Sequence, residues 1–97
     1  MPQIIVSASA LRGLKRCQEF LTARAPFAVK QASQTIASHL GLLKVSPYVG
    51  RPVRDLPALR ELVISFGNSG YLALYYYDIT EDAIYILAFR HQRELAY

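Results

Sequence analysis

Residues 58–97 read ALRELVISFGNSGYLALYYYDITEDAIYILAFRHQRELAY and decide the fold. The stretch contains three runs rich in β-branched and aromatic residues, about Arg60–Phe66, Tyr71–Tyr77 and Ala83–Phe89, which is the composition of β-strands. Glycine and asparagine in Gly67–Gly70, and the polar run Asp78–Asp82, are typical of hairpin turns. The sequence therefore predicts a three-stranded antiparallel meander.

Both faces of the middle strand of this meander carry apolar side chains. Because side chains alternate along a strand, Leu72 and Leu74 fall on one side and Tyr75 and Tyr77 on the other. We predict that one face packs on helices and that the tyrosine-rich face stays open for a partner.

The segment before the meander predicts one strand and two helices. Gln3–Ser7 is a short β-type run, and Ser7 and Ser9 are candidate N-caps for a helix that ends near Arg24. Pro26 suits the first turn of a second helix. The apolar stripes of the two helices are Ala10, Leu14, Cys17 and Leu21, and Val29, Ala32, Ile36, Leu40 and Leu43. The short link between the helices predicts an antiparallel hairpin.

The segment Ser46–Pro57 contains three prolines and a glycine. We predict a loop that carries Arg51 and Arg54 to the edge of the sheet. The expected fold is therefore α+β: a strand, an antiparallel helical hairpin and a three-stranded antiparallel meander, in a single domain over residues 1–97.

Composition limits the class of protein. The chain has 97 residues, of which 53% are hydrophobic and 19% charged, which predicts one folded core. A single cysteine, Cys17, on an apolar stripe indicates a buried thiol and neither a disulfide nor a metal site. No signal peptide or membrane span is recognisable, so we expect a cytoplasmic protein. We also expect that it uses neither a metal nor a cofactor.

Positive charge is concentrated in the first two thirds of the chain. The segment from Arg12 to Arg60 holds nine basic residues and two acidic ones. This asymmetry indicates an anionic partner, either nucleic acid or an acidic protein segment. Solvated helix faces are the alternative explanation.

The last eight residues form the one constellation with catalytic potential. The chain lacks the motifs of nucleotide hydrolases, dehydrogenases, zinc proteases and α/β-hydrolases. RNA cleavage through the 2′-hydroxyl needs a base, cationic groups and an acid, and His91, Arg90 or Arg93, and Tyr97 have suitable chemistry. The alternative is that these are solvated residues of a C-terminal surface.

The chain resembles the RelE/ParE toxins of bacterial type II toxin–antitoxin systems in several short motifs and in the predicted order of its strands and helices. The matching pieces are Gly50-Arg51-Pro52-Val53, Ser69-Gly70-Tyr71, and Arg90-His91-Gln92-Arg93-Glu94 with Tyr97. The resemblance covers essentially the whole chain and implies the strand, hairpin and meander fold derived above.

The RelE-like branch of this family consists of ribosome-dependent mRNA endonucleases with catalytic lysines and arginines. The positions that match three of these cations are Val63, Ser65 and Leu72, and a fourth matches His91. Because each electrostatic contact of this kind is worth about 3 kcal/mol in a transition state, the resemblance disfavours RelE-type catalysis. An endonuclease that uses His91 and Tyr97 is retained as the alternative function.

The ParE-like branch resembles the chain more closely in the GRPV and RHQRE pieces, and implies a non-enzymatic toxin that binds DNA gyrase. The expected gyrase-binding residues are Arg51, Arg54, Arg90, His91, Arg93, Glu94 and Tyr97. The expected partner is a cognate antitoxin, in a hetero-oligomer, whose acidic segment folds on binding. The expected antitoxin-binding residues are Arg12, Lys15, Arg16, Lys30, Tyr75 and Tyr77. A protein with this fold that has lost both activities is the third possibility.

Overall fold

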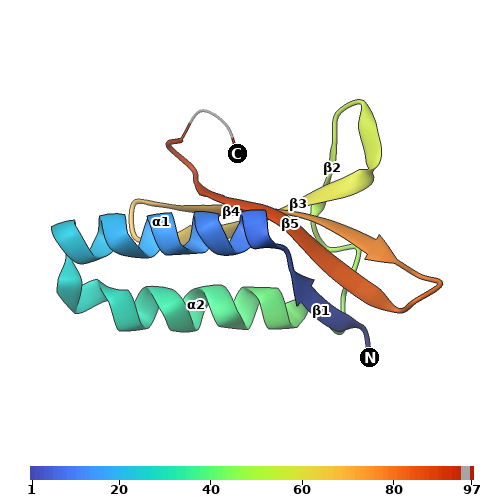
Figure 1. Ribbon diagram of the computed structural model, residues 1–97, viewed down its shortest axis with the longest axis horizontal. Coiled ribbons are helices and arrows are strands. Elements are labelled where there is room, and N and C mark those ends of the chain that lie inside the picture. Colours follow the sequence, from blue (N-terminus) through green and yellow to red (C-terminus); the bar gives the residue numbers. More distant parts are fainter. Residues whose placement is uncertain (95–96) are drawn as a thin grey trace.

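The protein folds into a sheet with two helices on one face (Figure 1). A computed structural model describes residues 1–94 and 97. The elements in chain order are β1 (Gln3–Val6), α1 (Ala8–Arg24), a 3₁₀ turn (Pro26–Ala28), α2 (Val29–Leu42), β2 (Arg51–Val53), β3 (Leu56–Phe66), β4 (Ser69–Asp78) and β5 (Ala83–His91). The predicted α+β fold, with its helical hairpin and meander, is confirmed.

The sheet has the strand order β1-β5-β4-β3-β2. β1 runs parallel to β5, with Gln3 opposite Ala83, and the remaining pairs are antiparallel. The prediction of a loop over residues 46–57 was wrong in part, because Arg51–Val53 forms the edge strand β2 and β3 begins at Leu56. Pro52 lies in this edge strand, where a residue without an N–H is tolerated.

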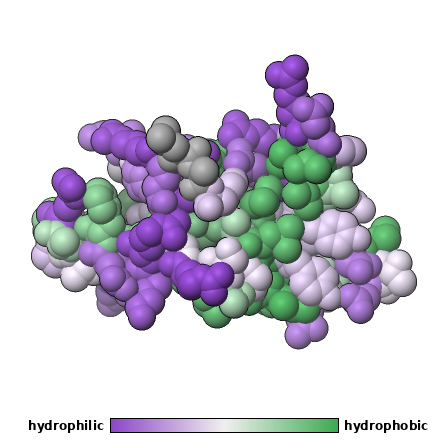
Figure 2. Space-filling view, turned by 45° about the horizontal axis from the view of Figure 1, so that its top comes forward, coloured by the Kyte–Doolittle hydropathy of each residue, from purple (hydrophilic) through white to green (hydrophobic). Residues whose placement is uncertain are grey.

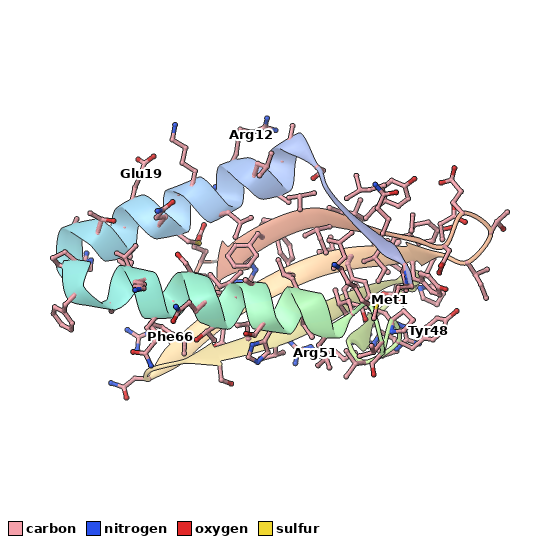
Figure 3. The ribbon with its side chains drawn as sticks, turned by 90° about the horizontal axis from the view of Figure 1, so that it is seen from below. Met1, Arg12, Glu19, Tyr48, Arg51 and Phe66 are labelled. Carbon is pink, nitrogen blue, oxygen red and sulfur yellow. The ribbon has the colours of Figure 1, made fainter. Side chains whose placement is uncertain are left out.

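Local sequence signals place the two helices. The Ser7 hydroxyl accepts a hydrogen bond from the Ala10 N–H at 3.1 Å and so caps α1. Pro26 opens the 3₁₀ turn that leads into α2. Seen from below, both helices lie in front of the sheet (Figure 3), so they cover one of its faces. None of the helices within the described residues has the length and apolar character needed to cross a membrane.

The face of β4 that carries Tyr71, Tyr75 and Tyr77 is the one covered by the helices. Tyr71 and Tyr75 are buried in the core with Ile64 and Phe89. The prediction that this face is open was therefore wrong. The Tyr75 hydroxyl explains how so polar a side chain is buried completely, since it donates to the Pro47 carbonyl and accepts from the Gly50 N–H, both at 2.8 Å.

Tyr75→Phe is expected to lower the free energy of unfolding by about 1–3 kcal/mol, because it leaves the Gly50 N–H and the Pro47 carbonyl without their partner while the ring is kept. Urea denaturation measures the change. Tyr76→Phe is the matched control, since no hydrogen bond joins its hydroxyl to a described residue. Equal stability of the two variants would contradict a structural role for the Tyr75 hydroxyl.

The opposite face of the sheet, here called the open face, carries Glu61, Val63, Leu72, Leu74 and Tyr76. Neither described helix covers it, and residues 92–94, after β5, turn toward this side of the sheet (Figure 1). Figure 2 shows a band of hydrophobic residues over this part of the surface. The uncovered face is therefore the leucine-bearing one, and it is accessible at Val63 but not at Leu72, which is buried.

Candidate functional site

The C-terminal tail is divided between the two faces of the sheet. Arg90 and His91 are consecutive on β5, so their side chains point to opposite faces. Arg90 lies opposite Leu72 on the open face, and His91 lies opposite Tyr71 on the helix-covered side. The structure therefore separates residues that the sequence places in one group.

Arg90 organises the turn that follows β5. Its Nη1 donates to the carbonyl oxygens of His91, Gln92 and Glu94. Its guanidinium also lies over the Tyr97 ring, 5.1 Å from the ring centroid, which is a cation–π geometry. Arg90 thus holds the tail against the open face through Nη1 and the guanidinium plane, while its buried Nε has no partner among the described residues.

Glu61 joins two of the predicted site residues on the open face. The Tyr97 hydroxyl donates to Glu61 Oε2 at 2.6 Å, and Arg51 Nε donates to Oε1 at 3.0 Å. Burial acts to raise the pKa of Glu61, but the hydrogen bonds from Tyr97 and Arg51 and the charges of Arg51 and Arg90 outweigh it and lower that pKa overall. Burial, followed by the Glu61 hydrogen bond, raises the pKa of Tyr97, which makes Tyr97 a weaker acid.

Sequence reasoning missed Glu61, although a signal was present. Glu61, Val63 and Ser65 alternate with Leu62 and Ile64, which places Glu61 on the face opposite to the core. Its partner Arg51 becomes predictable once Arg51–Val53 is recognised as a strand beside β3, because Arg51 is directly opposite Glu61.

His91 is held on the other face by Ser69 and Arg93. Its Nε2 is 3.0 Å from Ser69 Oγ, and its Nδ1 accepts the Arg93 N–H at 3.1 Å. This assigns the proton of the neutral ring to Nε2. Burial, and next the Arg93 charge, lower the pKa of His91. Because the lone pair on Nδ1 is already used and Tyr97 lies on the open face, His91 and Tyr97 do not form one catalytic pair in this structure.

Glu94 connects the tail to α1. Its carboxylate accepts from Arg16 Nε and from the His91 N–H, both at 3.0 Å. Burial favours a higher pKa for Glu94, but these hydrogen bonds and the Arg16 charge together lower it. The Cys17 thiol lies beside this carboxylate, and burial together with the Glu94 charge raises the pKa of Cys17 to about 11. Cys17 is therefore a protonated, buried thiol, as its position on the apolar stripe indicates.

Acid is expected to destabilise the protein through Glu94. A carboxyl group whose pKa is lowered on folding stabilises the folded state at any pH above its ordinary pKa of 4.5. This stabilisation is lost as the pH falls through the pKa that the group has in the folded state. Glu94→Gln should therefore show a shallower loss of stability below pH 4.5 than the wild type in urea denaturation. An identical pH dependence in the two proteins would contradict this role.

Three of the four positions predicted for the missing catalytic cations lie on the open face, and the fourth, His91, lies on the helix-covered side. Val63 is opposite Leu72, and Leu72 is opposite Arg90 on the next strand. Ser65 follows Val63 on the same face of β3. The row Val63–Leu72–Arg90 across three strands therefore contains one basic residue, and two apolar residues occupy the other positions.

The remaining predicted residues lie on separate surfaces. Arg54 and Arg93 are exposed, as are Arg12, Lys15 and Lys30 on the helices; Figure 3 shows Arg12 on the side of α1 away from the sheet. Tyr77 is half-buried and donates to Asp82, whereas Tyr75 has no exposed surface for an antitoxin. Within residues 1–94 and 97, no group of three or more His, Cys, Asp or Glu side chains could hold a metal ion.

Comparison with solved structures defines the class of fold. The chain is similar to a chain in the crystal structure of the intact E. coli RelBE toxin–antitoxin complex, with a TM-score of 0.66 and 12% identity over 97% of this chain and 100% of that one. It is also similar to a chain of the RelBE2 toxin–antitoxin complex from Mycobacterium tuberculosis, with a TM-score of 0.63 and 21% identity over 95% and 100% of the two chains. The fold is that of the RelE/ParE toxins.

Comparison of sequences places the chain within a family. Toxin RelE3 of Caulobacter vibrioides is 33% identical over 94 residues, which are 97% of this chain and 98% of the relative. Residues 4–96 match the model of the family described as ParE toxin of type II toxin-antitoxin system, parDE. The chain belongs to this family of toxins, and the predicted resemblance is confirmed.

Proposed function

We propose that the protein is a ParE-like toxin that inhibits bacterial DNA gyrase by binding it and that a cognate antitoxin neutralises it. The observation that carries this proposal is the Val63–Leu72–Arg90 row on the open face. The RelE-like branch is expected to place catalytic cations at the first two of these positions, and aliphatic side chains cannot stabilise a charged phosphorane. Binding without catalysis therefore accounts best for this surface, and the target puts the toxin in the cytoplasm.

The proposed gyrase contacts are the cations that the fold leaves exposed, in two separate places. Arg54 follows β2, and Arg93 lies in the turn after β5; neither takes part in an ion pair between described residues. Arg51, Arg90, His91 and Glu94 are held by internal hydrogen bonds and position these contacts. Tyr97, with 46% of its surface exposed, contributes the edge of its ring.

The antitoxin-binding surface combines the basic side of the helices with the open face. Arg12, Lys15 and Lys30 are exposed and suit acidic side chains of the partner. Leu74 and the stacked rings of Tyr76 and Tyr85, 6.5 Å apart, supply apolar area on the open face in place of the buried Tyr75. An antitoxin segment that folds on binding can contact both regions. The two RelBE structures, whose chains share this fold, are themselves toxin–antitoxin complexes.

Two assays with the purified chain test the proposed target. The toxin is expected to produce gyrase-dependent DNA cleavage or inhibition of supercoiling, and no cleavage of mRNA on translating ribosomes. The addition of the cognate antitoxin should abolish the effect. Cleavage of mRNA that is lost in Tyr97→Phe, with gyrase unaffected, would replace the proposal by the endonuclease alternative. No effect on either target or on bacterial growth would indicate that both activities have been lost.

A further inference from the structure

A basic cleft lies between the second half of α1, the β3–β4 turn and the end of β5. It has a volume of about 610 Å³ and is lined by Arg16, Phe20, Arg24, Asn68, Ser69, His91, Arg93 and Glu94. The cleft is on the helix-covered side of the sheet edge, and neither Glu61 nor Tyr97 of the open face lines it. It is therefore a surface separate from the row of residues discussed above.

The walls of this cleft carry an excess of positive charge. Three arginines line it, and the one carboxylate among the lining residues, Glu94, is already bound to Arg16 by an ion pair of 3.0 Å. Arg24 and Arg93 form no ion pair with a described residue. His91 adds no charge when neutral. Two unneutralised guanidinium groups facing one cleft favour an anionic ligand.

The cleft also presents a flat, unsaturated surface. Phe20 is 52% exposed, although it is a large apolar side chain. The Arg24 guanidinium lies over its ring at 4.3 Å from the centroid, and the His91 ring centroid is 6.3 Å from that of Phe20. Nucleobases stack on aromatic rings and on guanidinium planes. A carboxylate-bearing peptide would satisfy the charges of the cleft but would leave this platform unused.

We propose that the cleft binds a nucleotide unit of single-stranded nucleic acid, with the phosphate at Arg24 and Arg93 and the base against Phe20. The volume of the cleft is sufficient for a base, a sugar and a phosphate. Such binding goes beyond gyrase inhibition: it shares Arg93 with the proposed gyrase-binding surface but also uses Phe20 and Arg24 of α1, which that surface does not include. A phosphate beside His91 would favour the protonated ring and so would raise the pKa of His91 on binding.

Fluorescence anisotropy with labelled single-stranded oligouridylate and oligothymidylate tests the proposal on the full-length chain. Arg24→Glu combined with Arg93→Glu is expected to weaken binding at least tenfold, because two phosphate contacts are lost. Arg12→Glu combined with Lys15→Glu is the matched control: it makes the same total change in net charge, at residues of α1 that do not line the cleft. This control should weaken binding no more than about threefold through long-range electrostatics.

Phe20→Leu isolates the stacking contribution, since it retains the net charge and most of the apolar volume. It is expected to weaken binding about fivefold or more. Equal losses in the cleft variant and the control variant would show diffuse electrostatic attraction and would overturn the proposal. No binding by the wild type, an unchanged affinity in Phe20→Leu, or equally tight binding of an oligoglutamate peptide would also overturn it.

Discussion

Gly13→Ala is expected to lower the free energy of unfolding by about 3 kcal/mol, which is unusual for an alanine placed inside a helix. A Cβ atom at this position would lie 2.0 Å from the Phe89 carbonyl oxygen of β5. Neither atom belongs to a flexible side chain, so α1 would have to move away from the sheet. That movement would also disturb the ion pair between Arg16 of α1 and Glu94, whose Nη2 and Oε2 atoms are 3.0 Å apart.

Gly41→Ala is the matched control for Gly13→Ala, because both glycines lie in helices and nothing lies within 4 Å of a Cβ atom at Gly41. This control should gain up to about 1 kcal/mol from the higher helix propensity of alanine. Thermal unfolding measures both variants, and a loss of 3 kcal/mol corresponds to a decrease in Tm on the order of 15 °C for a domain of this size. A Gly13→Ala variant as stable as the wild type would show that α1 and β5 do not approach so closely.

Periodicity and turn chemistry were sufficient to predict both helices and the meander, because these signals are local. The edge strand β2 was missed because three prolines dominate residues 46–57, and a three-residue strand is defined by its pairing with β3 and not by its own composition. The wrong prediction that the tyrosine-bearing face of β4 is open also arose because the deciding contacts are not local in sequence. Tyr75 is buried because residues 47 and 50, distant in sequence, satisfy its hydroxyl.

The sequence was sufficient to identify the residues of the candidate site but not to predict how they are arranged in space. The tail residues were identified from their chemistry, and alternation along β5 already implies that Arg90 and His91 face opposite sides. What the sequence could not provide is the path of the chain after His91. The turn held by Arg90 returns Tyr97 to Glu61, 36 positions earlier in the sequence, while Glu94 reaches Arg16 on the other side. Contacts of this range depend on tertiary structure that no local pattern encodes.

Arg54→Glu is expected to weaken gyrase inhibition roughly 30-fold, with little effect on folding. Arg51, which lies in β2, is bound to Glu61, whereas Arg54 is exposed and forms no ion pair with a described residue. Reversal of a charge that meets an acidic partner costs about 2 kcal/mol or more at an interface, and 1.4 kcal/mol is a factor of ten in affinity. An exposed substitution changes stability by about 0.5 kcal/mol or less.

Lys44→Glu is the matched control for Arg54→Glu, because Lys44 is exposed, lies just after α2 and undergoes the same reversal of charge. Dose–response curves of gyrase supercoiling, together with thermal unfolding of each variant, separate binding from folding. If the surface around β2 binds the target, Arg54→Glu shifts the curve and Lys44→Glu does not. If both variants shift it equally, net charge governs the interaction and the binding surface lies elsewhere. If neither shifts it while the wild type inhibits gyrase, the loop has no part in binding and the exposed turn after β5, with Arg93, must supply the contact.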